Sequence, residues 1–179
     1  MRTTQNVHFI KHSQRGIALA MTLIFLVLLT ILGITAINTS TLEERMSGNT
    51  KDQNLSFQAA ETALRAAETW VQSTTAATQL AVNNANGIYA PSTTTTEVWD
   101  SVAWSGTSNL VVYPGVPGAS ATGTLGDVNS NPKYIIENIL TEALSPSGTR
   151  VTVRITARGT GASDNTVSMV QSTYSKTYP

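Results

Sequence analysis

The stretch SQRGIALAMTLIFLVLLTILGITAI, residues 13–37, changes from polar and basic to wholly apolar in a single step. Gly16 stands at the boundary between the two parts. The apolar run from Ile17 to Ile37 has 21 residues and carries no charge. As a helix it would be roughly 32 Å long, which is enough to cross the hydrocarbon core of a bilayer. The sequence therefore predicts a membrane-spanning helix near the N-terminus.

The charges around this run predict its orientation. Arg2, Lys11 and Arg15 lie before Gly16, and the first acidic residue of the chain is Glu43. Because positive flanking charges stay in the cytoplasm, we expect the N-terminal end inside and the rest of the chain outside. A secretory signal has a shorter apolar region that ends at a small-x-small cleavage site, and no such site follows this run. The pattern favours a single-pass protein.

Composition argues against several kinds of chemistry. The chain has no cysteine, which excludes disulfides, thiolate zinc sites and cysteine nucleophiles. Beyond Gly16 there are 8 basic and 11 acidic residues, so no basic footprint for nucleic acid is present. Both histidines, His8 and His12, precede Gly16 and are interpreted as polar leader residues, although their spacing could hold a metal. We expect a protein without enzymatic activity and without a cofactor.

Helical patterning continues beyond the apolar run. Thr50 and Gln53 match a capping box, which would restart or reinforce a helix at this point. Glu61 and Arg65 are spaced as a helical ion pair. Small and apolar residues recur at threes and fours and predict one buried stripe, formed by Leu55, Ala59, Ala63, Ala66 and Trp70. We predict one helix over 17–72, hydrophobic in its first half and amphipathic in its second, with Gly33 and Gly48 as its weak points.

Strand patterns dominate the C-terminal part of the chain. RVTVRITAR (150–158) alternates apolar and polar residues, and after a turn-rich segment NTVSMVQSTY (165–174) follows as its hairpin partner. Residues 133–140 and 109–113 are predicted as further strands. The apolar face of such a sheet can cover the stripe of the long helix. The sequence therefore predicts an α+β fold in which a long N-terminal helix packs on a C-terminal antiparallel sheet.

The middle of the chain is rich in Thr and Asn. Residues 73–97 are predicted to form an extended surface loop, with a glycan-bearing or ligand-contacting loop as the functional alternative. Trp99 and Trp104 are interpreted as anchors that pack this region onto the rest of the domain. The domain 73–179 would then lie outside the membrane.

One short motif resembles a calcium loop. DVNSNP (127–132) places Asp127, Asn129 and Asn131 at alternate positions, but Pro132 and Asn138 stand where an EF-hand needs Gly and Glu. A turn with Asx hydrogen bonds is the favoured interpretation, and an irregular calcium loop is the weaker alternative. We expect no calcium-dependent stabilisation.

The basic leader, the apolar helix and its amphipathic continuation together resemble a type IV prepilin. More specific segments are similar to the PilX-type minor pilins and lie within residues 14–72 and 133–175. They are TLEERMSGN (41–49), FQAAETALRAAE (57–68), YIIE (134–137), ITARGTG (155–161) and VQSTY (170–174). The pilin fold is the expected architecture. For residues 73–130 we identify no specific resemblance.

The resemblance implies processing at the boundary in the opening stretch. A prepilin peptidase would cleave after Gly16 and methylate the new amino group of Ile17, so that 1–16 is a removed leader. The helix 17–72 would remain, with 17–37 as the membrane span and later the filament core. The apolar residues of that span are Ile17, Ala18, Leu19, Ala20, Met21, Leu23, Ile24, Phe25, Leu26, Val27, Leu28, Leu29, Ile31, Leu32, Ile34 and Ile37.

Met21 departs from the family pattern. It is the fifth residue counted from Ile17, where most pilins carry a glutamate thought to pair with the amino terminus of a neighbouring subunit. A subunit with nothing above it can lack that acid, so Met21 points to the filament tip or its initiation complex. The implied partners are other minor pilins, the major pilin, the prepilin peptidase and the inner-membrane assembly platform. The implied location is the bacterial inner membrane, with the head in the periplasm, and later the pilus on the cell surface.

Three functions are compatible with these observations. The first is a minor pilin that helps to initiate assembly and supports twitching motility, adhesion or DNA uptake. The second is a tip adhesin or DNA-uptake pilin that binds a ligand directly. The third is a single-pass periplasmic protein unrelated to filaments.

Overall fold

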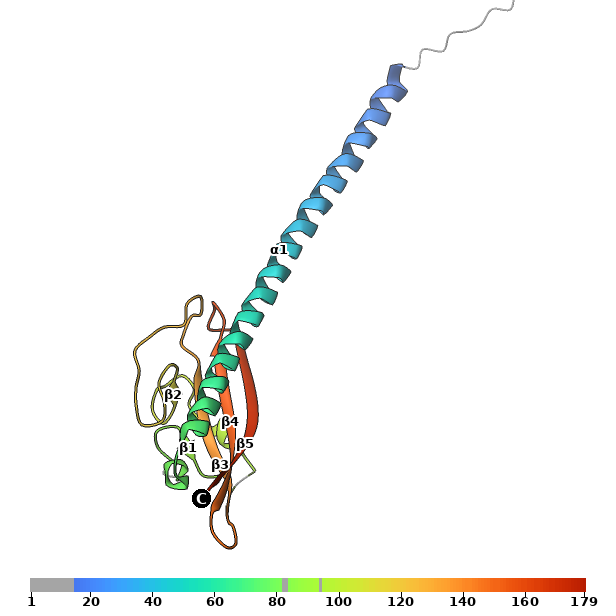
Figure 1. The fold of residues 1–179 in the computed structure, drawn as a ribbon. Helices are drawn as coiled ribbons and strands as arrows, with labels where there is room; N and C mark the ends of the chain where they lie inside the picture. The colour runs from blue at the N-terminus through green and yellow to red at the C-terminus, as the bar shows by residue number, and fades with distance from the viewer. Residues whose placement is uncertain (1–14, 82–83, 94) are drawn as a thin grey trace, which may run out of the picture. The chain divides into compact units, whose positions relative to one another are not determined.

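A computed structural model of the protein describes residues 15–81, 84–93 and 95–179 (Figure 1). The predicted leader therefore lies outside the described residues, except for its last two positions. Two compact units, Met1–Ser47 and Gly48–Pro179, divide the chain. In order along the chain, the elements are α1 (Arg15–Ser73), η1 (Ala77–Leu80), β1 (Ile88–Tyr89), α2 (Val98–Ser101), β2 (Val111–Val112), β3 (Lys133–Ala143), β4 (Thr149–Thr160) and β5 (Val167–Tyr178).

The helix α1 confirms the predicted long helix almost to the residue. It passes through Gly33 and Gly48 without a break, and the boundary between the two compact units falls just before Gly48. Because the helix is already continuous at Thr50, the predicted capping box does not start a new helix. The predicted pair is present, with Arg65 Nε 3.9 Å from a carboxylate oxygen of Glu61.

The sheet confirms the predicted α+β class. Its strand order is β1-β3-β4-β5, and β2 also pairs with β3. The β3–β4 and β4–β5 pairs are antiparallel, as the sequence predicted for 133–140, 150–158 and 165–174. The predicted strand at 109–113 is the two-residue β2, also antiparallel to β3. The unpredicted strand β1 is parallel to β3, with Ile88 opposite Ile136.

The core of the second unit lies between its part of α1 and one face of the sheet. The predicted apolar face of β4 is confirmed, since Val151, Val153, Ile155 and Ala157 are all buried. The predicted stripe of α1 is wrong in part, because Leu55, Ala66 and Trp70 are only half-buried. The buried face is turned by about one residue around the helix. It is formed by Ser56, Ala59, Ala60, Ala63, Leu64, Ala67 and Val71.

The described parts of the region from 73 to 97 contain two short elements where the sequence predicted an extended loop. Leu80 of η1 and Ile88 of β1 are buried, so this prediction is wrong over both elements. The short pairing of β1 with the middle of β3 explains the difference, because it depends on contacts that are distant in the sequence. Trp99 and Trp104 pack against the buried cluster of Val98, Leu110 and Ile135, which confirms their predicted role as anchors.

Candidate functional site

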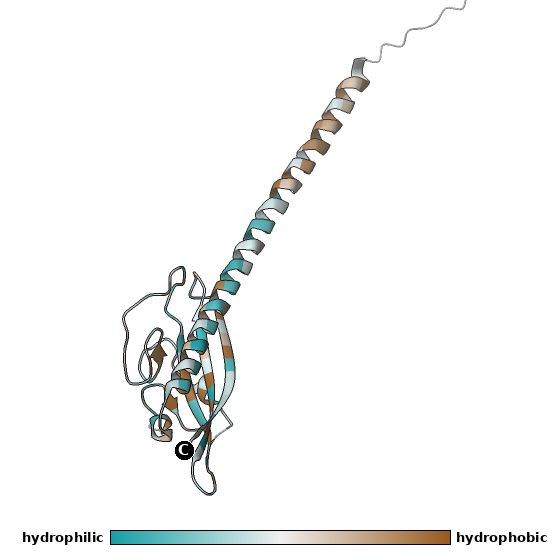
Figure 2. Cartoon of the chain, in the orientation of Figure 1, coloured by the Kyte–Doolittle hydropathy of each residue, from teal (hydrophilic) through white to brown (hydrophobic). Residues whose placement is uncertain are grey.

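The first part of α1 is an apolar surface that nothing in the described chain covers. Every residue from Gly16 to Ile37 is exposed, including all of the predicted span residues. Figure 2 shows this stretch as the brown beginning of α1. Burial of one large aliphatic side chain contributes about 1.5–3 kcal/mol, so a run of this length demands an apolar environment. Within the described residues, α1 is the helix that is long and apolar enough to cross a membrane.

Polar side chains within this run are satisfied by the helix itself. The hydroxyl groups of Thr22, Thr30 and Thr35 donate to backbone carbonyl oxygens one turn earlier, at 2.8–2.9 Å. A hydroxyl without a partner is costly in hydrocarbon, and these internal bonds remove that cost. The threonines are therefore compatible with a lipid or helix-lined environment, a feature that the apolar count alone did not reveal.

The predicted processing site lies in the first turn of α1. Gly16 and Ile17 are both exposed, and the space around Gly16 is open. Met21 is 64% exposed and lies on an apolar groove of the helix surface with Phe25 and Leu29. Cleavage, methylation and the role of Met21 remain predictions.

The calcium motif does not gather its side chains around one point. The Asn129 side-chain amide donates to Asp164, whereas Asn131 donates to the Gly123 carbonyl oxygen at 2.6 Å and accepts from the Leu125 amide at 3.0 Å. The third candidate, Asp127, is exposed and has a positive φ of 68°. Among the described residues, no group of three or more His, Cys, Asp or Glu could hold a metal. The absence of calcium-dependent stabilisation remains a prediction.

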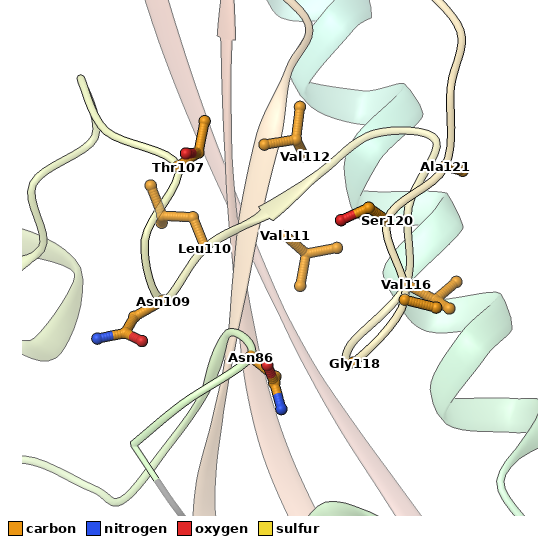
Figure 3. Close-up of a pocket in the computed structure, with 11 residues that line it drawn as sticks. Asn86, Thr107, Asn109, Leu110, Val111, Val112, Val116, Gly118, Ser120 and Ala121 are labelled. Atoms are coloured by element: carbon orange, nitrogen blue, oxygen red, sulfur yellow. The ribbon is translucent and has the colours of Figure 1, made fainter.

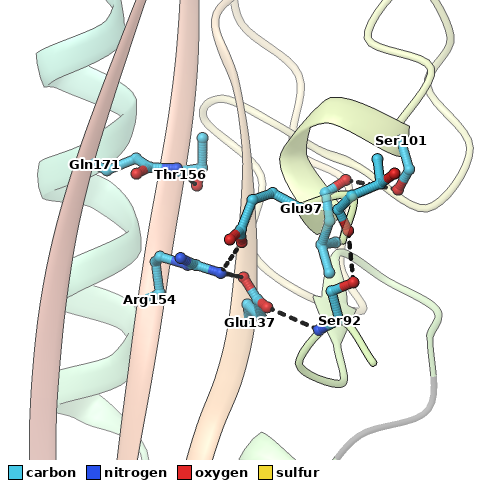
Figure 4. Close-up of polar contacts among 9 residues, drawn as sticks. Ser92, Glu97, Ser101, Glu137, Arg154, Thr156 and Gln171 are labelled. Atoms are coloured by element: carbon cyan, nitrogen blue, oxygen red, sulfur yellow. Dashed lines mark hydrogen bonds and ion pairs between the residues drawn. The ribbon is translucent and has the colours of Figure 1, made fainter. Parts of the chain in front are cut away.

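An ion pair between Arg154 and the buried Glu137 holds Ser92 and Glu97 on the sheet face that points away from α1 (Figure 4). Arg154 of β4 lies opposite Glu137 of β3 and donates to its carboxylate at 2.8 and 2.9 Å. The second carboxylate oxygen of Glu137 accepts from the Ser92 amide at 3.2 Å, and Arg154 also donates to Glu97 at 2.5 Å. The hydrogen bond to Glu137 raises the pKa of Arg154. Because Glu137 is only 2% exposed, these partners take the place of water around its carboxylate.

Sequence reasoning missed this network. Glu137 and Arg154 each fall in a predicted strand, and a correct strand register would have placed them opposite each other. No sequence pattern around Ser92 or Glu97 predicted that these residues contact the pair.

An open cleft of about 530 Å³ lies beside β2 (Figure 3). Asn86, Val111 and the 116–121 segment line it together with other small or polar residues. Among the described residues, those that line the cleft carry no charged side chain and no imidazole.

Comparison with protein families agrees with this architecture. A model described as PilX N-terminal matches residues 15–65, and one described as type IV pilus assembly protein PilX C-term matches residues 44–176. No curated protein and no solved structure gives a significant match.

Proposed function

We propose that this chain, which belongs to the PilX family of type IV pilus assembly proteins, is a minor pilin which helps to initiate pilus assembly and ends at or near the pilus tip. Family membership points to a structural, non-enzymatic protein of the pilus. It also removes the hypothesis of a periplasmic protein unrelated to filaments.

The observation that carries the proposal is the exposed apolar beginning of α1. A bilayer can bury the stretch from Gly16 to Ile37 before assembly, and neighbouring pilin helices can bury it afterwards. The second part of the same helix packs under its own sheet and is not available for this purpose. The basic leader supports an orientation with the head in the periplasm.

Processing is the second element of the proposal. Cleavage after Gly16 by a prepilin peptidase and methylation of Ile17 would remove the charges that hold the leader in the cytoplasm, and would keep the apolar helix. The shaft position is disfavoured by Met21, which offers no carboxylate to the amino terminus of a neighbouring pilin. The partners are the other minor pilins, the major pilin and the assembly platform, and twitching motility, adhesion and DNA uptake would follow through the filament.

Substitution of Gly16 tests the processing. Gly16→Val enlarges the residue at the cut, so we expect a full-length precursor in the membrane and loss of surface pili. Gly16→Ala keeps a small side chain and is the matched control, for which we expect cleavage. Wild-type protein that keeps its leader in assembled pili would contradict the proposal.

A deletion strain separates assembly from adhesion. We expect far fewer surface filaments, with the major pilin still present in the membrane. Normal piliation combined with a loss of adhesion or DNA uptake would instead support the second hypothesis, in which the head binds a ligand directly.

A further inference from the structure

We propose that the free edge of β5 is a docking site for an extended, uncharged strand of another exported pilus protein, which joins the sheet beside β5. This inference rests on the proposed function, because it assumes that the chain assembles with other proteins. The contact would be formed by main-chain hydrogen bonds, as in other cases of strand addition.

The edge of β5 has none of the usual protections. It is the last strand of the order β1-β3-β4-β5 and lies at the margin of the sheet (Figure 1). Natural edge strands are blunted by short length, proline, bulges or an exposed lysine. By contrast, β5 has 12 residues, no proline, and an unbroken register against β4. Its one charged residue, Lys176, directs its ammonium group to the carbonyl oxygens of Gln72 and Thr74 at 2.5 Å.

The hydrogen-bond pattern identifies the residues of this edge. Gly161 donates to the Thr166 carbonyl oxygen at 2.9 Å, and the antiparallel register continues from this pair into β4 and β5. Bonded and non-bonded pairs alternate in such a ladder, so every second residue of β5 turns its N–H and C=O away from β4. The outward residues are Val167, Met169, Gln171, Thr173, Ser175 and Thr177. All six side chains are exposed, and their backbone groups have no partner among the described residues.

The side chains of the edge define the chemistry of the incoming strand. The alternate residues of β5 face α1, as the 2.6 Å contact between the Ser56 and Ser168 hydroxyls shows. The outward residues therefore lie on the opposite face, where Val167 and Met169 are apolar and the remaining four are neutral hydroxyl or amide residues. None of the six outward residues presents an ionisable side chain to the added strand. An uncharged strand with apolar residues beside Val167 and Met169 matches it.

A second copy of the chain does not fit the edge in the favoured antiparallel arrangement. Contacts from Ser56 to Ser168 and from Glu68 to Ser172 show that α1 runs in the same direction as β5. A two-fold axis between antiparallel β5 strands would therefore point the Gly48 ends of the two helices in opposite directions. The two chains would then leave their heads towards their N-terminal segments from opposite ends of the paired sheets, so a strand of another protein is the proposed occupant.

One pair of variants isolates the backbone contact. Thr173→Pro removes an outward N–H, while Thr173→Ala keeps that N–H and removes a side chain that makes no hydrogen bond in the described chain. Proline is tolerated where the N–H faces away from the ladder. With both variants cleaved after Gly16, we expect roughly tenfold less of the proline variant than of the alanine variant in sheared pili. Equal amounts would overturn the docking site.

Hydrogen exchange on the wild-type full chain tests the docking site at the β5 edge even if the proline variant does not fold. The exchange of the Met169, Gln171, Thr173 and Ser175 amides is compared between the chain alone in detergent and the chain in its isolated pilus complex. We expect these amides to exchange at least about tenfold more slowly in the complex. Unchanged exchange in a chain that is cleaved and needed for piliation would overturn the docking site and leave the proposed function intact.

Discussion

At the scale of single residues, small side chains decide how closely α1 approaches the sheet. A Cβ atom at Gly159 would overlap the Ser56 carbonyl oxygen and lie 2.5 Å from the Ala60 nitrogen. Two positions further on, a Cβ at Gly161 would overlap the carboxylate of Asp52. The Asp52 carboxylate accepts from the Ala162 amide at 2.5 Å, and so fixes the turn between β4 and β5 to the helix. These positions allow no side chain without a shift of the backbone.

Gly159→Ala should therefore destabilise the head. The added methyl group meets backbone atoms on α1, and overpacking of this kind costs about 1–3 kcal/mol. Urea unfolding of the full chain in detergent measures the loss. The matched control is Gly126→Ala, because no atom lies within 4 Å of a Cβ at Gly126. Equal stability of the two variants would show that α1 and the sheet can separate without cost.

Asp52 should make the stability of the head depend on pH. The Thr166 side-chain hydrogen bond lowers the pKa of Asp52, burial acts against this shift, and the Ala162 and Ser163 amides lower the pKa further. A pKa below the unfolded value means that the stabilisation is present above about pH 4 and is lost as the pH falls through the folded pKa. We expect Asp52→Asn to lose less stability than wild type between pH 7 and pH 3 in thermal unfolding. An identical loss in both proteins would rule out this role.

At the scale of elements, the Glu137–Arg154 pair joins β3 and β4 to Ser92 and Glu97. Glu137 is buried, so it depends on Arg154 and on the Ser92 amide for its stabilisation. The salt bridge to Glu97 is different, because the Glu97 side chain is 49% exposed and its interaction is weakened by solvent. Loss of the interactions of Glu137 should therefore destabilise the head more than loss of the salt bridge to Glu97.

Arg154→Ala should destabilise the head by about 3–5 kcal/mol, because it leaves the Glu137 carboxylate buried without its cation. Glu97→Ala is the matched control, with an expected loss of no more than about 1 kcal/mol. Urea unfolding measures both values, and limited proteolysis reports release of the 92–97 segment. The double variant Arg154→Met with Glu137→Leu should recover most of the lost stability. A double variant as unstable as Arg154→Ala would contradict the buried-charge explanation.

Sequence patterns predicted the elements better than their faces and partners. Strict alternation fixed the buried face of β4, since Val151 and Val153 cannot exchange with Thr152 without exposing the apolar side chains. The helix face was harder to predict because alanines lie on several sides of α1, and the close approach of Gly159 to Ser56 and Ala60 is a contact between residues distant in the sequence. The pairing of β1 with β3 and the Glu137–Arg154 contact depend on the strand register, which the sequence does not display locally.

At the scale of the whole molecule, the chain combines two units with different surroundings. The residues from Gly16 to Ile37 expose apolar side chains, whereas the unit from Gly48 onward contains its own core. Under the proposed function, such a subunit would move from a membrane into a filament without refolding its head. In the proposed tip position, Met21 would distinguish this chain from a shaft subunit.

Met21→Glu should not improve incorporation into pili and should reduce it. With no pilin above, the carboxylate has no amino terminus to pair with, and an unpaired acid in the membrane costs on the order of a few kcal/mol. The measurement is the ratio of this subunit to the major pilin in sheared filaments, with Met21→Leu as the matched control. A several-fold increase, with label along the shaft, would contradict the tip position.

Mass spectrometry of the N-terminal peptide from sheared wild-type pili is the strongest test of whether this chain is a processed pilin. We expect a scarce subunit whose chain begins with N-methylated Ile17 and contains no residue of the leader 1–16. A chain that retains Met1–Gly16 in the membrane and is absent from the pili would show that it is not a processed pilin.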